Sequence, residues 1–335
     1  MSDDTTFLDA LTRRGVLLSV SVRYWRARKK LNPEDLGLAR DRVDERLFAL
    51  GHKRLVPKER LQSLKLLESR AHALVEESTF PFLGGVARYL PDTKLEEVNV
   101  RLDTLKQEFD SETERFVSTY ASLRESALAE WRQAAGELDG DPVRLLAAVR
   151  DAFPGPVDLA RRFGFDIRLF QIAVPELPTT QLVALGDQLE LVRVRRQAAL
   201  QARQQIESSC SEFVADCVGE LRQQTAQLCT EMLETVNSTG SVHQKTLNRL
   251  LRFIERFGDL NFADDREMAA ELERTRAELL SRSAGEYRDS DMARNGLVQG
   301  LSRLRQRARD LATEDVSGLV ESFGRMGQRR FALAG

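Results

Sequence analysis

A long segment without proline, Thr180 to Asn237, is the feature that most limits what this chain can fold into. Its interior glycines, Gly186 and Gly219, stand too far apart to break a helix. Because an α-helix rises ~1.5 Å per residue, one continuous helix here would be about 85 Å long, which is unusual in a compact domain. Apolar residues recur along the segment with helical spacing: Ile206, Cys210, Phe213, Cys217, Leu221, Leu228, Met232 and Val236.

A second helical stripe begins after Pro91, where Thr93 and Glu96 have the spacing of a capping box. Steps of three and four residues approximate a heptad pattern, which is typical of coiled-coil packing. The pattern predicts a helix that ends near Gly136 and is roughly 65 Å long. The stripe consists of Leu95, Val98, Leu102, Leu105, Phe109, Phe116, Tyr120, Leu123, Ala127 and Trp131.

These two stripes predict the fold class: a mainly α protein, an elongated antiparallel bundle or coiled coil with two very long helices. The connector 154–178 is too short for a parallel return. Three regions follow: 1–91 with a strand and short helices, 92–240 as the long-helix stalk, and 241–335 as a helical C-terminal region. The predicted packing seam consists of Leu102, Leu105, Phe109, Phe116, Ile206, Phe213, Cys217 and Leu221.

One short segment has the pattern of a strand. Leu18, Val20, Val22 and Tyr24 alternate with Ser19, Ser21 and Arg23, and this period of two is typical of a half-buried strand. A strand needs a pairing partner, and residues 165–169 are the candidate. The sequence therefore leaves room for a small β-hairpin element in an otherwise helical chain.

The charge balance argues against a global electrostatic role. The 335 residues include 50 basic and 52 acidic side chains, for a formal net charge of -2. Any binding of nucleic acid or anionic lipid must therefore come from local patches. The cysteines, Cys210, Cys217 and Cys229, all take apolar helical positions, which favours reduced core thiols. With an acidic start and no long apolar run, we expect a cytoplasmic protein and no membrane contact.

A search for chemistry-bearing motifs predicts no catalytic, cofactor-binding or metal site. His52, His72 and His243 are widely separated, and no cysteine pair has zinc-ligand spacing. The chain contains no glycine-rich phosphate loop and no nucleophile elbow. Pairs of carboxylates occur at predicted helix starts, where they complement the helix dipole. We therefore expect a protein that is not an enzyme.

A dense basic cluster near the N-terminus is the best candidate for a binding site. For most such clusters a solvated face is the more frequent explanation, but this one also has aromatic neighbours, Tyr24 and Trp25. Contact with phosphates is the sharper interpretation, and it makes nucleic-acid binding an alternative function. The cluster consists of Arg23, Arg26, Arg28, Lys29 and Lys30.

A further alternative rests on the apolar stretch from Phe80 to Val86, which contains a proline and two glycines. Such a stretch between long helices suggests the tongue of a helical pore-forming protein. It is too short to cross a bilayer, however, so a buried loop that caps the bundle is favoured.

Five short motifs are Arg23–Leu31, Pro33–Gly37, Phe82–Gly85, Leu247–Phe262 and Arg329–Phe331. Together they resemble those of a bacterial protein family of unknown function. In that family the gene often lies beside genes for a MoxR-type AAA+ ATPase, similar to a cobaltochelatase subunit, and a von Willebrand factor A-domain protein, on mobile elements and in phage-related regions.

The resemblance implies partners and no catalytic residues. Together with the long apolar stripes, it predicts a non-enzymatic scaffold or adaptor that acts with the ATPase and the von Willebrand A-domain protein in a mobile-element or phage-defence system. Homo-oligomerisation stays open, because the same stripes can be covered within one chain or between copies.

Overall fold

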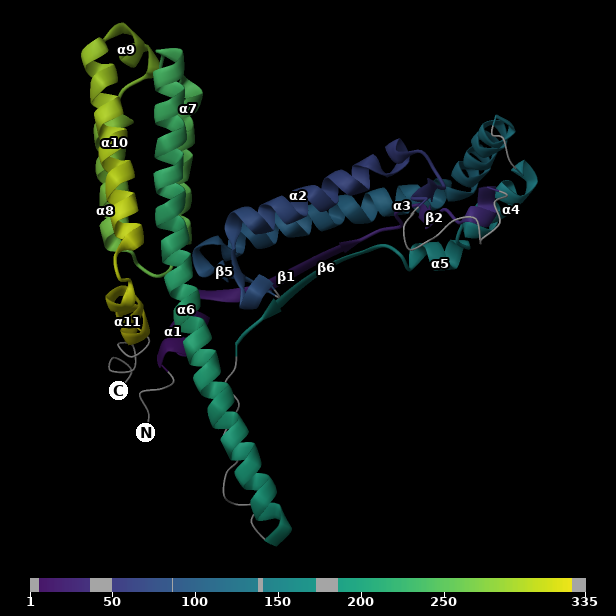
Figure 1. Cartoon of the computed structure of the whole chain (residues 1–335), viewed down its shortest axis with the longest axis horizontal. Helices are drawn as coiled ribbons and strands as arrows, with labels where there is room; N and C mark the ends of the chain where they lie inside the picture. The colour runs from purple at the N-terminus through teal and green to yellow at the C-terminus, as the bar shows by residue number, and fades with distance from the viewer. Residues whose placement is uncertain (1–5, 37–49, 86, 138–140, 173–185, 327–335) are drawn as a thin grey trace. The chain divides into compact units, whose positions relative to one another are not determined.

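The computed structural model of the chain describes residues 6–36, 50–85, 87–137, 141–172 and 186–326. Most of its helices and strands are labelled in Figure 1, and η denotes a 3-10 helix in the text. The first part of the chain contains α1 (Thr6–Arg14), β1 (Gly15–Arg23), β2 (Arg28–Lys30), η2 (Pro33–Leu36), β3 (His52–Arg54), η4 (Lys58–Leu61), α2 (Gln62–Ser78), β4 (Phe80–Phe82), η5 (Leu83–Gly85) and β5 (Ala87–Pro91). The second part contains α3 (Asp92–Gly136), α4 (Pro142–Ala152), α5 (Pro156–Ala160), β6 (Gly164–Phe170), α6 (Gly186–Thr239), α7 (Gln244–Leu260), α8 (Arg266–Leu279), α9 (Ala284–Asp289), α10 (Asp291–Thr313) and α11 (Ser317–Met326).

The chain folds into two compact units, each assembled from segments that are distant in sequence. Unit 1 combines Met1–Leu18, Ser78–Glu96 and Leu169–Gly335, and unit 2 combines Ser19–Glu77 and Glu97–Arg168. The unit boundaries fall within β1, α3 and β6, and near the end of α2.

The predicted fold class, a mainly α bundle or coiled coil with two very long helices, is wrong. The structure is mixed α/β, because four strands form a sheet in the order β4-β5-β1-β6 and β2 pairs with β3 in a second sheet. Two helices of 45 and 54 residues occur, α3 and α6, but they do not form the expected pair. Most of α3 belongs to unit 2, whereas α6 belongs to unit 1 and packs against the shorter α10.

In unit 1, short helices that follow α6 in sequence cover its C-terminal half. Figure 1 shows α7, α8 and α10 alongside that half. The amphipathic pattern explains the packing, since α7 and α10 each carry buried apolar residues at steps of three and four. These buried residues are Leu247, Leu250, Ile254 and Phe257 on α7, and Leu297, Leu301, Leu304, Ala308 and Leu311 on α10.

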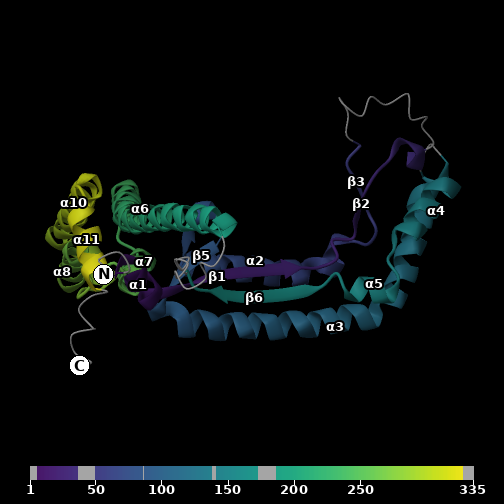
Figure 2. The ribbon, with the colours of Figure 1, turned by 90° about the horizontal axis from the view of Figure 1, so that it is seen from below.

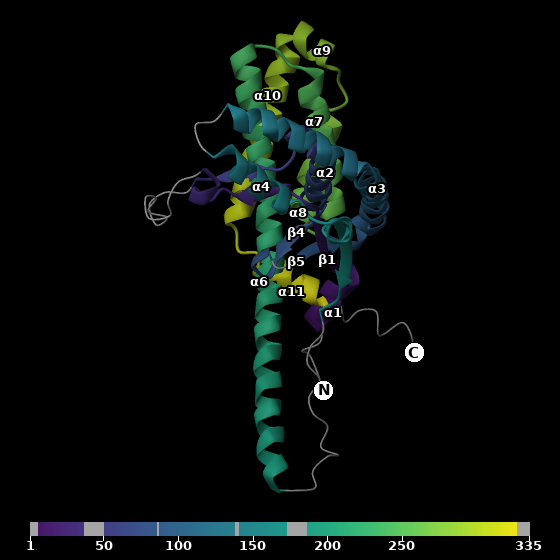
Figure 3. The ribbon, with the colours of Figure 1, turned by 90° about the vertical axis from the view of Figure 1, so that its right-hand side faces the viewer.

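The N-terminal half of α6 has a different environment. From residue 193 to residue 209, no described side chain of this helix is buried. Val194 is 56% exposed and Leu200 is 44% exposed, although both are large and apolar. Figure 3 shows this part of α6 continuing as a single helix beyond α7 and α10 of the same unit.

The core of unit 1 also includes aromatic side chains from the four-stranded sheet. β5 pairs antiparallel with β4 and with β1, in a register that places Gly15 opposite Pro91. The hydroxyl of Tyr89 donates a hydrogen bond of 2.9 Å to the carbonyl of Leu11. Gly15 is required here, because a Cβ at that position would lie 2.6 Å from the Tyr89 ring and 2.5 Å from the Leu90 carbonyl oxygen.

The apolar stretch that suggested a pore-forming tongue begins as strand β4. Phe80 and Phe82 are buried, and the Phe82 ring packs edge-on against Phe213 at 4.8 Å between centroids. Val86, the end of that stretch, lies outside the described residues. Within the part of the chain that the structure describes, no helix is long and apolar enough to cross a membrane.

A buried ion pair links three helices of unit 1. Arg222 of α6 donates to Asp265 at 2.7 Å, and the two side chains are only 6% and 3% exposed. The second arm of the Arg222 guanidinium donates to the carbonyl of Leu311 in α10, at 2.6 Å. Asp265 is also the N-cap of α8 and accepts the backbone N–H of Met268. One charge pair thus connects α6, the start of α8 and the end of α10.

In unit 2, helices α2 and α3 lie side by side and antiparallel (Figure 1), with Arg70 paired to Glu108 at 2.6 Å. Near the start of α2, the core is aromatic. Trp25 contacts Phe116, Tyr120 and Phe153, with centroid distances of 6.1, 5.7 and 6.0 Å.

The predicted seam residues take part in two separate cores. Those from α3 are buried in unit 2, and those from α6 lie in unit 1, where Ile206 is half-buried and the others are buried. The four from α3 are Leu102, Leu105, Phe109 and Phe116, and the four from α6 are Ile206, Phe213, Cys217 and Leu221.

We expect Asp265→Asn to destabilise the protein by about 3–5 kcal/mol, because it leaves the buried Arg222 charge without a counterion. Asparagine caps a helix as well as aspartate does, so the loss reports the charge and not the cap. Urea unfolding followed by circular dichroism measures it. Glu271→Gln is the matched control: it removes an exposed pair with Arg274 on the same helix and should cost no more than about 1 kcal/mol. Equal losses in the two variants would contradict this role.

The burial of the cysteines predicts how fast their thiols react. All three are free and buried. Burial raises the pKa of the Cys210 thiol to about 11 and that of Cys229 to about 12, and it raises the pKa of Cys217 as well. Since the thiolate is the reactive form, we expect the native protein to react slowly with a disulfide reagent at pH 8 and to release its thiols in guanidinium. A fast thiol in the native protein would contradict the buried placement.

Candidate functional site

The two-stranded sheet of unit 2 brings together basic residues from distant parts of the sequence. β2 and β3 pair antiparallel, with Arg28 opposite Arg54 and Lys30 opposite His52. Backbone hydrogen bonds extend the pairing at both ends, from Leu31 to Gly51 at 3.1 Å and from Leu55 to Ala27 at 2.8 Å. Figure 2 shows the two strands side by side.

A buried ion pair fixes the orientation of this sheet. Lys53 of β3 donates to Asp35 of η2 at 2.6 Å, and the side chains are 5% and 9% exposed. The same carboxylate accepts the backbone N–H of Asn32 at 2.9 Å. Because successive side chains of a strand point to opposite faces, burial of Lys53 directs His52 and Arg54 toward solvent.

The exposed face of the sheet carries two like charges directly across from each other. Arg28 and Arg54 are cross-strand partners, and both side chains are exposed. Like charges in directly opposite positions destabilise a sheet. Neither guanidinium has an ion-pair partner among the residues that the structure describes. A bound anion would relieve this repulsion.

These two arginines line a cavity of about 500 Å³, which we call the basic pocket. η4 adds Lys58 to the lining and α2 adds Lys65. No carboxylate belongs to the described lining. Lys58 and Lys65 also lack an ion-pair partner within the described ranges. The lining of the basic pocket consists of Tyr24, Arg26, Arg28, Arg54, Val56, Lys58, Leu61, Gln62 and Lys65.

Arg26 lies in the basic pocket but is already partnered. Its guanidinium binds Glu68 through two nitrogens and lies 4.0 Å above the centre of the Tyr24 ring. The hydrogen bond to Glu68 is the main cause that raises the pKa of Arg26, and burial raises the pKa of Tyr24. Arg26 therefore shapes the wall of the pocket, while the four cations without a described counterion supply its positive charge.

The structure divides the basic cluster that was predicted from the sequence. Arg26 and Arg28 line the basic pocket, whereas Lys29 and Lys30 are exposed on β2 outside its lining. Arg23, on β1, pairs with Asp166 at 3.0 Å.

Three cations of the basic pocket were not predicted: Arg54, Lys58 and Lys65. None of them belongs to the dense run of basic residues at 23–30. The available signal was the Arg54-Leu-Val-Pro-Lys58 segment, in which two cations flank an apolar turn.

A second, mostly apolar hollow adjoins the basic pocket, and we call it the apolar groove. Its volume is about 230 Å³, and Arg54 and Val56 line both cavities. The indole N–H of Trp131 donates to the carbonyl of Arg54 at 3.0 Å, which ties α3 to the end of β3. The lining of the apolar groove consists of Arg54, Leu55, Val56, Pro57, Ala127, Glu130, Trp131 and Ala134.

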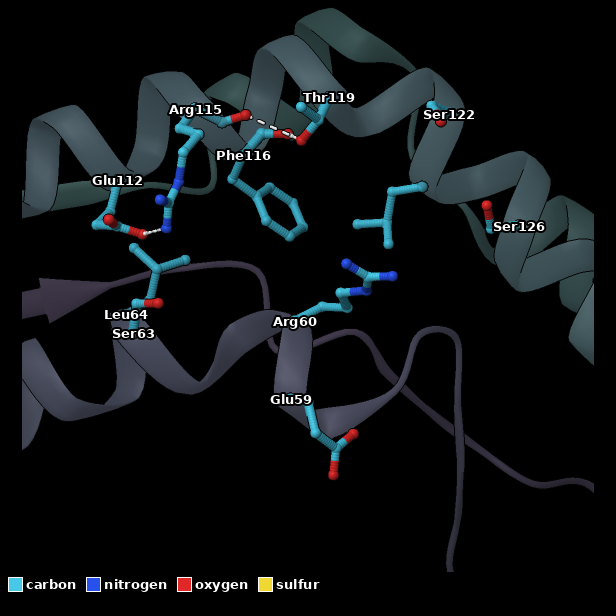
Figure 4. Close-up of a pocket in the computed structure, with 11 residues that line it drawn as sticks. Glu59, Arg60, Ser63, Leu64, Glu112, Arg115, Phe116, Thr119, Ser122 and Ser126 are labelled. Atoms are coloured by element: carbon cyan, nitrogen blue, oxygen red, sulfur yellow. Dashed lines mark hydrogen bonds and ion pairs between the residues drawn. The ribbon is translucent and has the colours of Figure 1, made fainter.

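Another cavity, of about 450 Å³, lies between the start of α2 and α3. Figure 4 shows Arg60 and the Phe116 ring directed into it, whereas Glu59 points away. Arg115 is neutralised by Glu112 at 2.5 Å. This cavity offers one cation without a partner in the described part of the chain, against four in the basic pocket, so it is the weaker site for a polyanion.

Among the described residues, no group of three or more His, Cys, Asp or Glu side chains is placed to hold a metal ion. The positive charge of the basic pocket thus comes from arginine and lysine side chains of the chain itself. Those donors bind phosphate oxygens through charge-assisted hydrogen bonds.

Comparison with known proteins identifies the family. Residues 12–282 match the family described as "Protein of unknown function (DUF3150)". Comparisons with the curated proteins and with the solved structures find no match. The matched range includes both sheets and the two longest helices, and it covers more than half of the chain. The chain therefore belongs to DUF3150, a family of unknown function.

Proposed function

We propose that the protein binds nucleic acid through the basic pocket. The observation that carries this proposal is the charge of Arg28, Arg54, Lys58 and Lys65, unpaired within the described residues, around one cavity that no described carboxylate lines. Phosphates repeat along a nucleic-acid backbone, so several cations around one cavity can bind two or more phosphates at once.

The whole chain offers no general attraction for polyanions, since its net charge is -2. Binding must therefore depend on this local patch, which makes the proposal easy to test by substitution. Arginine presents a planar fork that matches phosphate oxygens, and lysine contributes a point charge. Contacts of this kind position a nucleic acid and carry little sequence information. We expect binding that is weakly sequence-dependent and strongly salt-dependent.

Arg54→Glu is the most informative variant. It places opposite charges across the sheet at Arg28, which should stabilise the fold by about 0.2–1 kcal/mol. The same change should weaken binding of a labelled 20-nucleotide oligomer at least tenfold, measured by fluorescence anisotropy. The slope of log affinity against log salt should become shallower by about one for each phosphate that the variant no longer binds. Lower affinity together with equal or higher stability separates a binding role from a structural one.

Lys106→Glu combined with Arg132→Glu is the matched control for a double variant, Lys58→Glu with Lys65→Glu. All four cations are exposed in unit 2, but Lys106 and Arg132 do not line the basic pocket. The change in net charge is the same. If both double variants lose binding equally, the interaction is a non-specific charge effect, and the basic pocket is not the site.

A second candidate function is that of an adaptor for the AAA+ ATPase and the von Willebrand A-domain protein that the family resemblance implies. The observation that favours it is the N-terminal half of α6, where Val194 and Leu200 are exposed on a stretch without buried described side chains. Apolar side chains on a free helix face are suited to docking in the groove of a partner protein.

Copurification tests the adaptor role. We expect the tagged full-length chain to retain a MoxR-type ATPase encoded beside its gene, and Val194→Ser with Leu200→Ser to reduce the retained amount severalfold. Met292→Ser is the control, because Met292 is 86% exposed on α10 and lies away from this stretch. The proposal is contradicted if the ATPase is not retained with or without nucleotide, or if the α6 variant retains as much as the control.

A further inference from the structure

We propose that the apolar groove beside the basic pocket holds one unstacked nucleobase, so that the ligand is a single-stranded nucleic acid. This inference rests on the proposed function, because it assigns the phosphates to the basic pocket. It adds the class of nucleic acid, which the basic pocket alone does not determine.

The two cavities adjoin each other. Arg54 and Val56 line both of them, so a ligand that fills one reaches the border of the other. A nucleotide has the same two parts in the same order: a charged phosphate and a flat, largely apolar base. Arg54 thus lies at the border where the phosphate and base would meet.

The walls of the apolar groove are suited to a flat aromatic ring. Trp131 and Pro57 offer flat, rigid surfaces, and the small side chains of Ala127 and Ala134 leave the space open. Aromatic side chains bind bases of single strands by stacking, whatever the sequence, because every base has a π-face. A base inside a duplex is paired and stacked on both faces, so it cannot enter such a groove without being extruded.

The charged side chains at the apolar groove also fit a base better than a phosphate. Glu130 is the one carboxylate in its described lining, and it is exposed. A carboxylate repels a phosphate but accepts the amino N–H of cytosine, adenine or guanine. The groove is thus matched to a base edge, and the neighbouring pocket of cations is matched to the backbone.

The groove is also preformed. The hydrogen bond from Trp131 to the Arg54 carbonyl holds α3 against the end of β3, and Leu55 and Val56 are buried beneath it. A site whose walls are already ordered loses less conformational entropy on binding. A single strand can therefore use the groove without a rearrangement of the protein.

The experiment compares a single-stranded 20-mer of mixed sequence with its own duplex at the same salt concentration, using fluorescence anisotropy and the full-length chain. We expect the single strand to bind about tenfold more tightly, which corresponds to one stacked base. Ala134→Leu fills the groove without changing charge and should abolish this preference, with the affinity for duplex unchanged. Gln133→Leu is the control, since it adds the same side chain at an exposed neighbouring position that does not line the groove.

The outcomes separate the two proposals. If single strand and duplex bind equally well, or if Ala134→Leu keeps the preference, the inference about the groove is overturned and the basic pocket still stands as a site for nucleic acid. If neither form binds at low salt, the proposed function itself fails. If Ala134→Leu and Gln133→Leu both lose the preference for single strand over duplex, the inference is also overturned. The preference would then depend on the surface of α3 in general and not on the apolar groove.

Discussion

The buried ion pair between Lys53 and Asp35 decides which side chains of the β2–β3 sheet face solvent. Removing one partner of such a pair typically costs about 3–5 kcal/mol, so its geometry is strongly preferred. With Lys53 held inside, the alternation of the strand places Arg54 outside. The register then puts Arg28 across from Arg54. The exposed pair of like charges, which by itself is unfavourable, is a consequence of the favourable pair on the other face.

Many charges among the described residues are paired with a neighbour on the same helix. On α3, Arg101 pairs with Glu97 and Arg115 with Glu112, at helical spacings of four and three residues. Such pairs form wherever acidic and basic residues alternate along a helix. The basic pocket departs from this because its cations come from two short strands and the start of a helix. The carboxylate at helical spacing from Lys65, that of Glu68, binds Arg26 instead. A chain with a net charge near zero can therefore carry a concentrated positive site.

Local patterns in the sequence were more informative than long-range ones. The alternation from Leu18 to Tyr24 predicted a strand, and β1 (Gly15–Arg23) confirms it. The apolar placement of the cysteines also predicted their burial. The predicted fold class was wrong because an apolar stripe indicates that a helix face is covered, but it does not identify the element that covers it. The stripe of α6 is covered in part by α10, and the apolar residues of α10 do not indicate which helix they pack against. Arg54, Lys58 and Lys65 were missed for a related reason, since only the tertiary fold brings them to one cavity with Arg28.

Arg54 shows how one residue joins the parts of the candidate site. Its carbonyl accepts the indole N–H of Trp131, its side chain lines the basic pocket, and its position in β3 is set by the burial of Lys53. The backbone of this residue thus fixes α3 to the sheet, while its side chain stays available to a ligand. A change at the side chain alters charge and leaves those backbone interactions in place. For that reason, binding and stability can be separated at this position, which is seldom the case for a residue with so many neighbours.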